Sequence, residues 1–215
     1  MKLYYYDHCP YCVKARMIFG LKEVPLTLVP VLNDDVETPT KLVGKKVVPI
    51  LEKEDGTHMP ESMDIVRYID GKYGNGPLLD GPANPAIAAW LDSRSYASKL
   101  TMPRWVKCDL PEYKTEAARR YFKEKKEAAI GSFDEHLKKS AVYIKQSEAD
   151  LQKLEPLIQS KGAVNGAPSE DDIHLFAALR SQTIVKGLNF PHKVAEYLEN
   201  MSALSNVPLY FSMAI

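Results

Sequence analysis

The segment GNGPLLDGPANP, residues 74–85, divides this 215-residue chain into two parts with different folding patterns. Six of its twelve residues are Gly or Pro, a composition that ends helices and lets a chain cross between domains. Before this segment, strand and helix patterns alternate, whereas after it the apolar residues recur at helical spacing. We therefore expect an α/β domain over residues 1–73, a linker over residues 74–85 and an all-α domain over residues 86–215.

The first part has the element order βαβαββα. We predict strands over residues 2–6, 26–32, 48–53 and 57–59, and helices over residues 11–20, 38–43 and 62–73. A parallel pair joined by a helical crossover and an antiparallel pair joined by a hairpin form a mixed sheet. About 75 residues of this kind make a small, complete α/β domain.

The second part reads as a succession of helices. We predict them over residues 86–107, 115–130, 133–160, 169–186 and 192–201. Ser169 and Asp172 stand at the spacing of a capping box, which predicts a well-defined helix start and a buried, central helix.

Charge and cysteine content limit the possible partners. Lys plus Arg and Asp plus Glu both number 28, so no basic surface is expected for nucleic acid or for an anionic membrane. The N-terminal residues lack an apolar signal core, and we expect a cytoplasmic protein that does not enter membranes. Three cysteines are too few for a secreted disulfide framework, which favours a reactive role.

Two of these cysteines, Cys9 and Cys12, form the motif CPYC where the first predicted strand meets the first helix. Free N–H groups and the positive end of the helix dipole favour a thiolate at Cys9. Cys12 lies one turn further on and can attack a mixed disulfide formed on Cys9. The spacing therefore predicts a redox pair with Cys9 as the nucleophile.

A zinc site is the alternative explanation for such a pair, but zinc requires four ligands. The remaining cysteine, Cys108, lies about a hundred residues away without a metal-binding companion. We expect no metal, and we expect Cys108 to be an unreactive passenger. A structural disulfide is also disfavoured, because the cytosol would reduce it.

CPYC at this position resembles the glutaredoxin active site in a thioredoxin-like fold, and two further segments match that family. Val47-Val48-Pro49 is similar to its cis-proline segment, and Pro60-Glu61-Ser62 is similar to a glutathione-binding segment shared with glutathione transferases. The alternatives are a proline that only begins a strand and a serine that only caps a helix.

This resemblance implies a glutathione site. The backbone of Val48 would pair with the cysteinyl part of glutathione, and Pro49 would be cis. Glu61 would bind the ammonium group of the γ-glutamyl end, and Ser62 would bind its carboxylate. Tyr11 would flank the cleft. Lys45 or Lys46, just before Val47, could bind the glycyl carboxylate, but we prefer to interpret both as solvent-exposed lysines.

With its helical second part, the whole chain resembles the large two-domain bacterial glutaredoxins, which have a glutathione-transferase-like architecture. The resemblance implies a glutathione-dependent thiol-disulfide oxidoreductase acting on glutathionylated or disulfide-containing proteins, with glutathione as reducing co-substrate. We expect a monomer. A cysteine stands where the transferases use a Tyr or Ser hydroxyl, so conjugation of electrophiles should be poor.

Other functions remain open. An omega-type glutathione transferase or dehydroascorbate reductase would share the cleft but act on a small oxidised substrate. A non-catalytic module would use the helical domain to bind partners. Some glutaredoxins bridge an iron–sulfur cluster between two monomers, although the second domain would obstruct such pairing.

Overall fold

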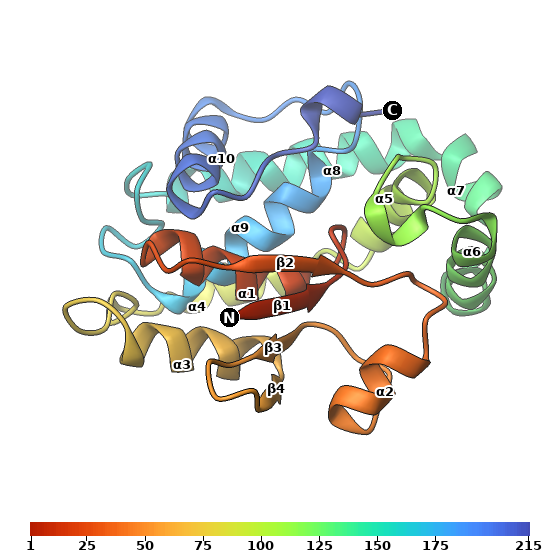
Figure 1. Cartoon of the computed structure of the whole chain (residues 1–215). Coiled ribbons are helices and arrows are strands. Elements are labelled where there is room, and N and C mark those ends of the chain that lie inside the picture. The colour runs from red at the N-terminus through yellow and green to blue at the C-terminus, as the bar shows by residue number, and fades with distance from the viewer.

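The computed structural model describes all 215 residues, and its N-terminal domain contains one mixed four-stranded sheet (Figure 1). The strands are β1 (Lys2–Tyr5), β2 (Thr27–Pro30), β3 (Ile50–Glu52) and β4 (His58–Pro60). Their spatial order is β2-β1-β3-β4. β1 pairs in parallel with β2 and antiparallel with β3, and β4 completes an antiparallel hairpin. The predicted βαβαββα order is confirmed.

Three helices cover this sheet: α1 (Pro10–Leu21), α2 (Glu37–Val43) and α3 (Ser62–Lys72). The strands are shorter than predicted, because apolar character continues beyond the residues that pair. The pairing of β2 with β1 ends at Pro30. The ring nitrogen of Pro30 has no hydrogen to donate to a neighbouring strand.

The C-terminal domain is helical. Its helices are α4 (Pro85–Asp92), α5 (Ala97–Trp105), α6 (Glu116–Ile130), α7 (Phe133–Lys138), α8 (Ser140–Leu154), α9 (Glu170–Gln182) and α10 (His192–Ser205). Short 3₁₀ turns occupy Pro111–Tyr113, Glu155–Leu157 and Phe211–Met213. No helix combines the length and apolar character that a membrane span needs.

Two helices predicted as continuous are each divided. The segment 86–107 breaks between α4 and α5, where the Ser93 hydroxyl donates to the carbonyl of Trp90. The segment 133–160 breaks at Lys139, and a 3₁₀ turn with Pro156 follows α8. Local hydrogen bonds from side chains to the backbone compete with continuation of a helix. The helical spacing of apolar residues resumes after each break, so the break cannot be recognised in the sequence.

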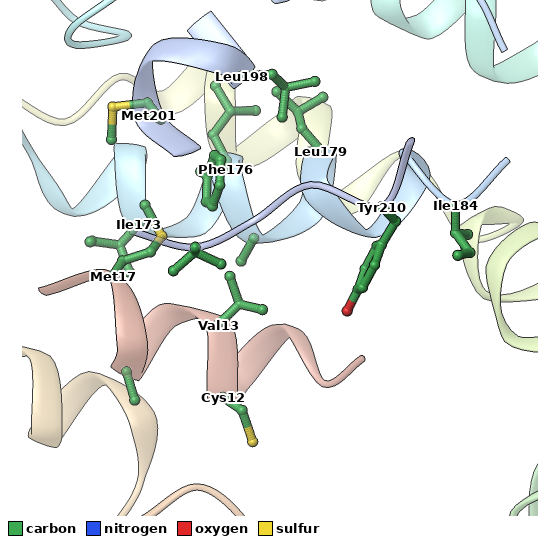
Figure 2. Close-up of a cluster of buried hydrophobic side chains, with 14 of the residues drawn as sticks. Cys12, Val13, Met17, Ile173, Phe176, Leu179, Ile184, Leu198, Met201 and Tyr210 are labelled. Atoms are coloured by element: carbon green, nitrogen blue, oxygen red, sulfur yellow. The ribbon is translucent and has the colours of Figure 1, made fainter. Parts of the chain in front are cut away.

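The two domains share a hydrophobic core in which α1 is central. α1 packs against α3 on the sheet side and against α9 and α10 on the other. Figure 2 shows Val13 and Met17 of α1 beside Ile173 and Phe176 of α9. At Gly20 an added Cβ would lie 2.0 Å from the carbonyl oxygen of Ser205, so only glycine permits this close approach of α1 and α10.

The predicted capping box at the start of α9 is confirmed. The amide of Ser169 donates to Asp172 Oδ2 at 2.9 Å, and Asp172 Oδ1 accepts from the amide of Val164 and the hydroxyl of Tyr197. Asp172 is buried, so its carboxylate connects three segments of the helical core.

Candidate active site

Cys9 lies at the junction between β1 and α1, where it is the N-cap residue of the helix. Its carbonyl accepts the first intrahelical bond, from Val13 at 3.0 Å. Pro10 occupies the first helical position, where its fixed φ suits the helix and its missing N–H costs nothing. Cys9 is half-buried, whereas Cys12 is fully buried, and both thiols are free. Figure 2 shows the sulfur of Cys12 directed away from the interdomain core.

The two thiols have opposite acidities. A hydrogen bond from the Cys12 thiol, the positive charge of His8 and the amides of Cys12 and Tyr11 outweigh burial and lower the pKa of Cys9 to about 6. Burial, followed by the hydrogen bond to Cys9 and then by the charge of Cys9, raises the pKa of Cys12 well above its ordinary value. At neutral pH the site therefore holds a thiolate at Cys9 and a thiol at Cys12.

His8 is fixed by the helical domain. Glu112 Oε1 lies 2.5 Å from His8 Nδ1 and also accepts the backbone N–H of His8 at 2.9 Å. The imidazole stacks on Tyr113 and lies between the rings of Trp105 and Phe122. The Glu112 carboxylate is completely buried, so the position of the imidazole beside Cys9 depends on a residue 104 positions away.

Asp7 is held by the same domain. Its carboxylate accepts from Arg180 and from the Tyr210 hydroxyl, each at 2.7 Å, and Arg16 of α1 donates to its other oxygen at 2.9 Å. Burial opposes ionisation, but the Arg180 and Arg16 guanidinium groups lower the pKa of Asp7 to about 2. This network ties the segment before Cys9 to the end of α9 and to the C-terminal segment.

The Val48–Pro49 peptide bond is cis, as the sequence resemblance implies. Neither the N–H nor the carbonyl of Val48 bonds to another backbone group. Lys46, two residues earlier, donates to the carbonyl of Asn33 at 2.6 Å and lies 3.8 Å from the centre of the Tyr121 ring.

The capping role considered for Ser62 is wrong. α3 begins at Ser62, its N-cap residue is Glu61, and no side chain caps the helix. Ile65 has the first amide with an intrahelical acceptor, the carbonyl of Glu61 at 3.0 Å. Glu61 is exposed and pairs with Lys45 at 3.0 Å, and its φ of 71° lies in the region that favours glycine. Such backbone strain is common at ligand sites.

A cavity of about 850 Å³ opens between the domains beside Cys9. Cys9, Tyr11 and Val48 line its N-terminal side, and residues of α4, α5, α6 and α9 form the remaining wall. Of the predicted site residues, Cys12, Pro49, Glu61 and Ser62 lie outside this lining. No group of three or more His, Cys, Asp or Glu side chains is arranged to hold a metal ion.

Sequence reasoning missed the residues that the helical domain supplies. Glu112, Trp105, Arg180 and Tyr210 contact the segment before Cys9, but nothing local marks them as site residues. Glu112 and Arg180 occupy helical turns in which a charged residue is normally solvent-exposed. One signal was available in the sequence. Arg180 is a charged residue at a helix position that the periodicity assigns to the core, and such a residue indicates a buried polar contact.

The comparisons with known proteins agree with this architecture. Residues 86–214 match the family model described as glutaredoxin 2, C-terminal domain. Residues 3–77 match the model for the glutathione S-transferase N-terminal domain. A structure of Gtt2 from Saccharomyces cerevisiae has a TM-score of 0.60 at 18% identity, covering 97% of this chain and all of that one, which shows a shared fold.

Two relatives are far more similar. Glutaredoxin 2 of Escherichia coli K12 is 54% identical over the full length of both chains. The crystal structure of glutaredoxin 2 from Salmonella typhimurium in complex with glutathione has a TM-score of 0.98 at 53% identity, covering 100% of this chain and 98% of that one. Because a family model covers more than half of the chain and this similarity spans its whole length, the chain belongs to the glutaredoxin 2 family.

Proposed function

We propose that this protein is a glutathione-dependent thiol-disulfide oxidoreductase that reduces protein–glutathione mixed disulfides. The Cys9 thiolate attacks the glutathione sulfur of the mixed disulfide, a new S–S bond forms between Cys9 and glutathione, and the protein thiolate leaves. A glutathione thiolate then attacks the Cys9-bound glutathione, forming oxidised glutathione and restoring the Cys9 thiolate. The protein cysteine is reduced, and one free glutathione is consumed, which leaves joined to the glutathione taken from the protein as one molecule of oxidised glutathione.

The observation that carries this proposal is the ionised, accessible sulfur of Cys9. Its pKa of about 6 lies below physiological pH, so the nucleophilic form predominates at pH 7. Cys9 also lines the interdomain cavity, which gives a disulfide access to the sulfur. The relatives named glutaredoxin 2 match over the full chain, which supports the same chemistry.

Cys12 provides the second route, for disulfides between protein cysteines. The nearby charge of Cys9 contributes to the raised pKa of Cys12, and this contribution disappears once Cys9 is bound in a mixed disulfide. Cys12 then deprotonates more readily, attacks the Cys9 sulfur and expels the second protein thiolate. The resulting Cys9–Cys12 disulfide is reduced by two glutathione molecules.

Glutathione is the proposed co-substrate and binds along the N-terminal side of the cavity. The unpaired backbone of Val48 before Pro49 suits pairing with the extended cysteinyl residue. The uncapped start of α3 at Ser62, with Glu61 beside it, suits the γ-glutamyl carboxylate and ammonium group. Tyr11, whose side chain is 60% exposed, flanks the tripeptide.

We also propose the finer organisation. Residues 1–73 and 86–215 form the two domains and residues 74–85 the linker, which agrees with family models that end at residue 77 and begin at residue 86. The protein acts as a monomer in the cytoplasm, a reducing compartment that suits its three free thiols.

The test compares Cys9→Ser with Cys12→Ser in the release of glutathione from a glutathionylated protein. Cys9→Ser should abolish turnover, because a hydroxyl is not ionised at neutral pH. Cys12→Ser should retain deglutathionylation but lose reduction of protein disulfides. Retained deglutathionylation in Cys9→Ser contradicts the proposed nucleophile, and wild-type behaviour of the double variant in cells would favour a non-catalytic binding module.

A further inference from the structure

Three residues that line the same cavity as Cys9 each have a buried N–H group without an acceptor. Arg94 Nε, Trp105 Nε1 and Gln182 Nε2 are buried side-chain nitrogen atoms with no hydrogen-bond partner, and all three residues belong to the cavity lining. Buried donors are normally satisfied, because an unmade hydrogen bond is costly. Their concentration in one cavity points to an acceptor group supplied by a ligand.

Arg94 is the most unusual of the three. It lies in the connection between α4 and α5, its exposed fraction is 8%, and its guanidinium forms no ion pair. The guanidinium lies 4.2 Å from the centre of the Trp90 ring, and its Nε has no hydrogen-bond partner. Burial lowers the pKa of Arg94 to about 10, although Tyr96 and Asp150 oppose this effect, and a bound carboxylate would favour the charged form further with two parallel hydrogen bonds.

The charges around Arg94 agree with an anionic ligand. The cavity lining contains four lysines besides Arg94 and a single carboxylate, Asp92. None of these four lysines lies within 4.0 Å of a carboxylate. The lysines that form ion pairs are other residues of the protein. The lysines are Lys14, Lys46, Lys125 and Lys126. In a chain with zero formal net charge, this excess of positive charge is local to the cavity.

We propose that the cavity wall around Arg94 is a subsite for an acidic side chain of the protein substrate, adjacent to its glutathionylated cysteine. The carboxylate would accept from Arg94, with Gln182 as a second donor. Leu91, Ala97 and Met102 supply apolar surface for the rest of the segment. The subsite thus selects glutathionylated cysteines by the charge of their sequence neighbours.

This inference rests on the proposed function and specifies its substrate class. The disulfide exchange at Cys9 is unchanged: the glutathione sulfur is attacked, and the peptide that occupies the Arg94 wall leaves as the thiolate. The proposed glutathione site uses Val48 of the cavity lining and the start of α3 outside that lining, so both halves of the mixed disulfide can be held at once.

The experiment measures kcat/KM for a set of glutathionylated peptides. The peptides differ only in one residue, Glu or Gln, placed one to four positions before or after the cysteine. The wild-type protein should prefer Glu over Gln about tenfold in at least one position, the size of one charge-assisted contact. In Arg94→Gln this preference should fall to within about twofold, and in Arg94→Lys it should persist in part.

Arg120→Gln is the matched control, since Arg120 is an exposed arginine of α6 outside the cavity lining and its loss changes the net charge equally. This variant should keep the preference for Glu. Equal turnover of Glu and Gln peptides at all positions by the wild-type protein would overturn the subsite while leaving the proposed function intact, whether or not Arg94→Gln folds. If Arg120→Gln loses the preference for Glu to the same extent, the preference arises from the overall charge of the protein, and the subsite is wrong. If no peptide is turned over, both proposals are wrong.

Discussion

The hydrogen bond from the Cys12 thiol is the largest cause of the low pKa of Cys9, and replacing Cys12 with Ala removes that donor. A hydrogen bond to a charged group contributes about 1.5–3 kcal/mol, and one pKa unit corresponds to about 1.4 kcal/mol. The pKa of Cys9 should therefore rise by about 1–2 units in Cys12→Ala. Cys12→Ser keeps an O–H donor at the same position and should change this pKa by less than about one unit.

The rate of alkylation by iodoacetamide measures this pKa directly. The rate should follow the Cys9 thiolate between pH 4 and pH 9, and mass spectrometry identifies the modified residue. Burial raises the pKa of Cys12 and of Cys108, so these thiols stay protonated in the lower part of the range. At pH 7, Cys9 should be about 90% thiolate in the wild-type protein and about 10–50% thiolate in Cys12→Ala. An unchanged midpoint in Cys12→Ala would refute the assignment of Cys12 as the principal stabiliser of the thiolate.

Three further outcomes follow from the surrounding contacts. Glu112→Gln removes the carboxylate that holds the His8 imidazole, and because the interaction with His8 lowers the pKa of Cys9, the alkylation midpoint of Cys9 should rise by up to about one unit. Because the pKa of Asp7 is about 2 against an ordinary 3.8, its carboxylate stabilises the fold by about 2 kcal/mol above pH 4. This contribution is lost as the pH falls through 2, so urea unfolding should show Asp7→Asn less stable at pH 7 and the difference reduced at pH 3. Ser62→Ala should raise the KM for glutathione about tenfold with a smaller effect on kcat.

The order of elements was predictable because local signals specify it. The strand Lys2–Tyr5 alternates buried and exposed residues, and Pro10 after Cys9 marks the start of a helix. The position of Cys9 at that helix start, and hence its tendency to ionise, follows from these few residues alone. The same holds for α9, where Ser169 and Asp172 lie three positions apart in the chain.

The electrostatics of the site were not predictable in the same way. Glu112 and Arg180 contact His8 and Asp7 across 104 and 173 positions in the chain. Periodicity and capping describe interactions over a few residues, so they carry no information about such pairs. Local patterns also assign the wrong cap to α3, because Glu61, and not Ser62, is the N-cap residue and adopts a positive φ that only the surrounding fold enforces.

The helical domain has a direct part in the proposed chemistry, because it both orients the nucleophile and builds the wall that faces it. Asp7 and His8 immediately precede Cys9 in the chain, and each is bound by buried side chains of that domain. A displacement of the domain would move the imidazole of His8 relative to the Cys9 sulfur and, in the same step, reshape the cavity lined by Arg94 and Trp105. Reactivity and substrate selection are therefore coupled in this protein through one interdomain contact, whereas a thioredoxin-like domain alone would have to provide both from its own loops.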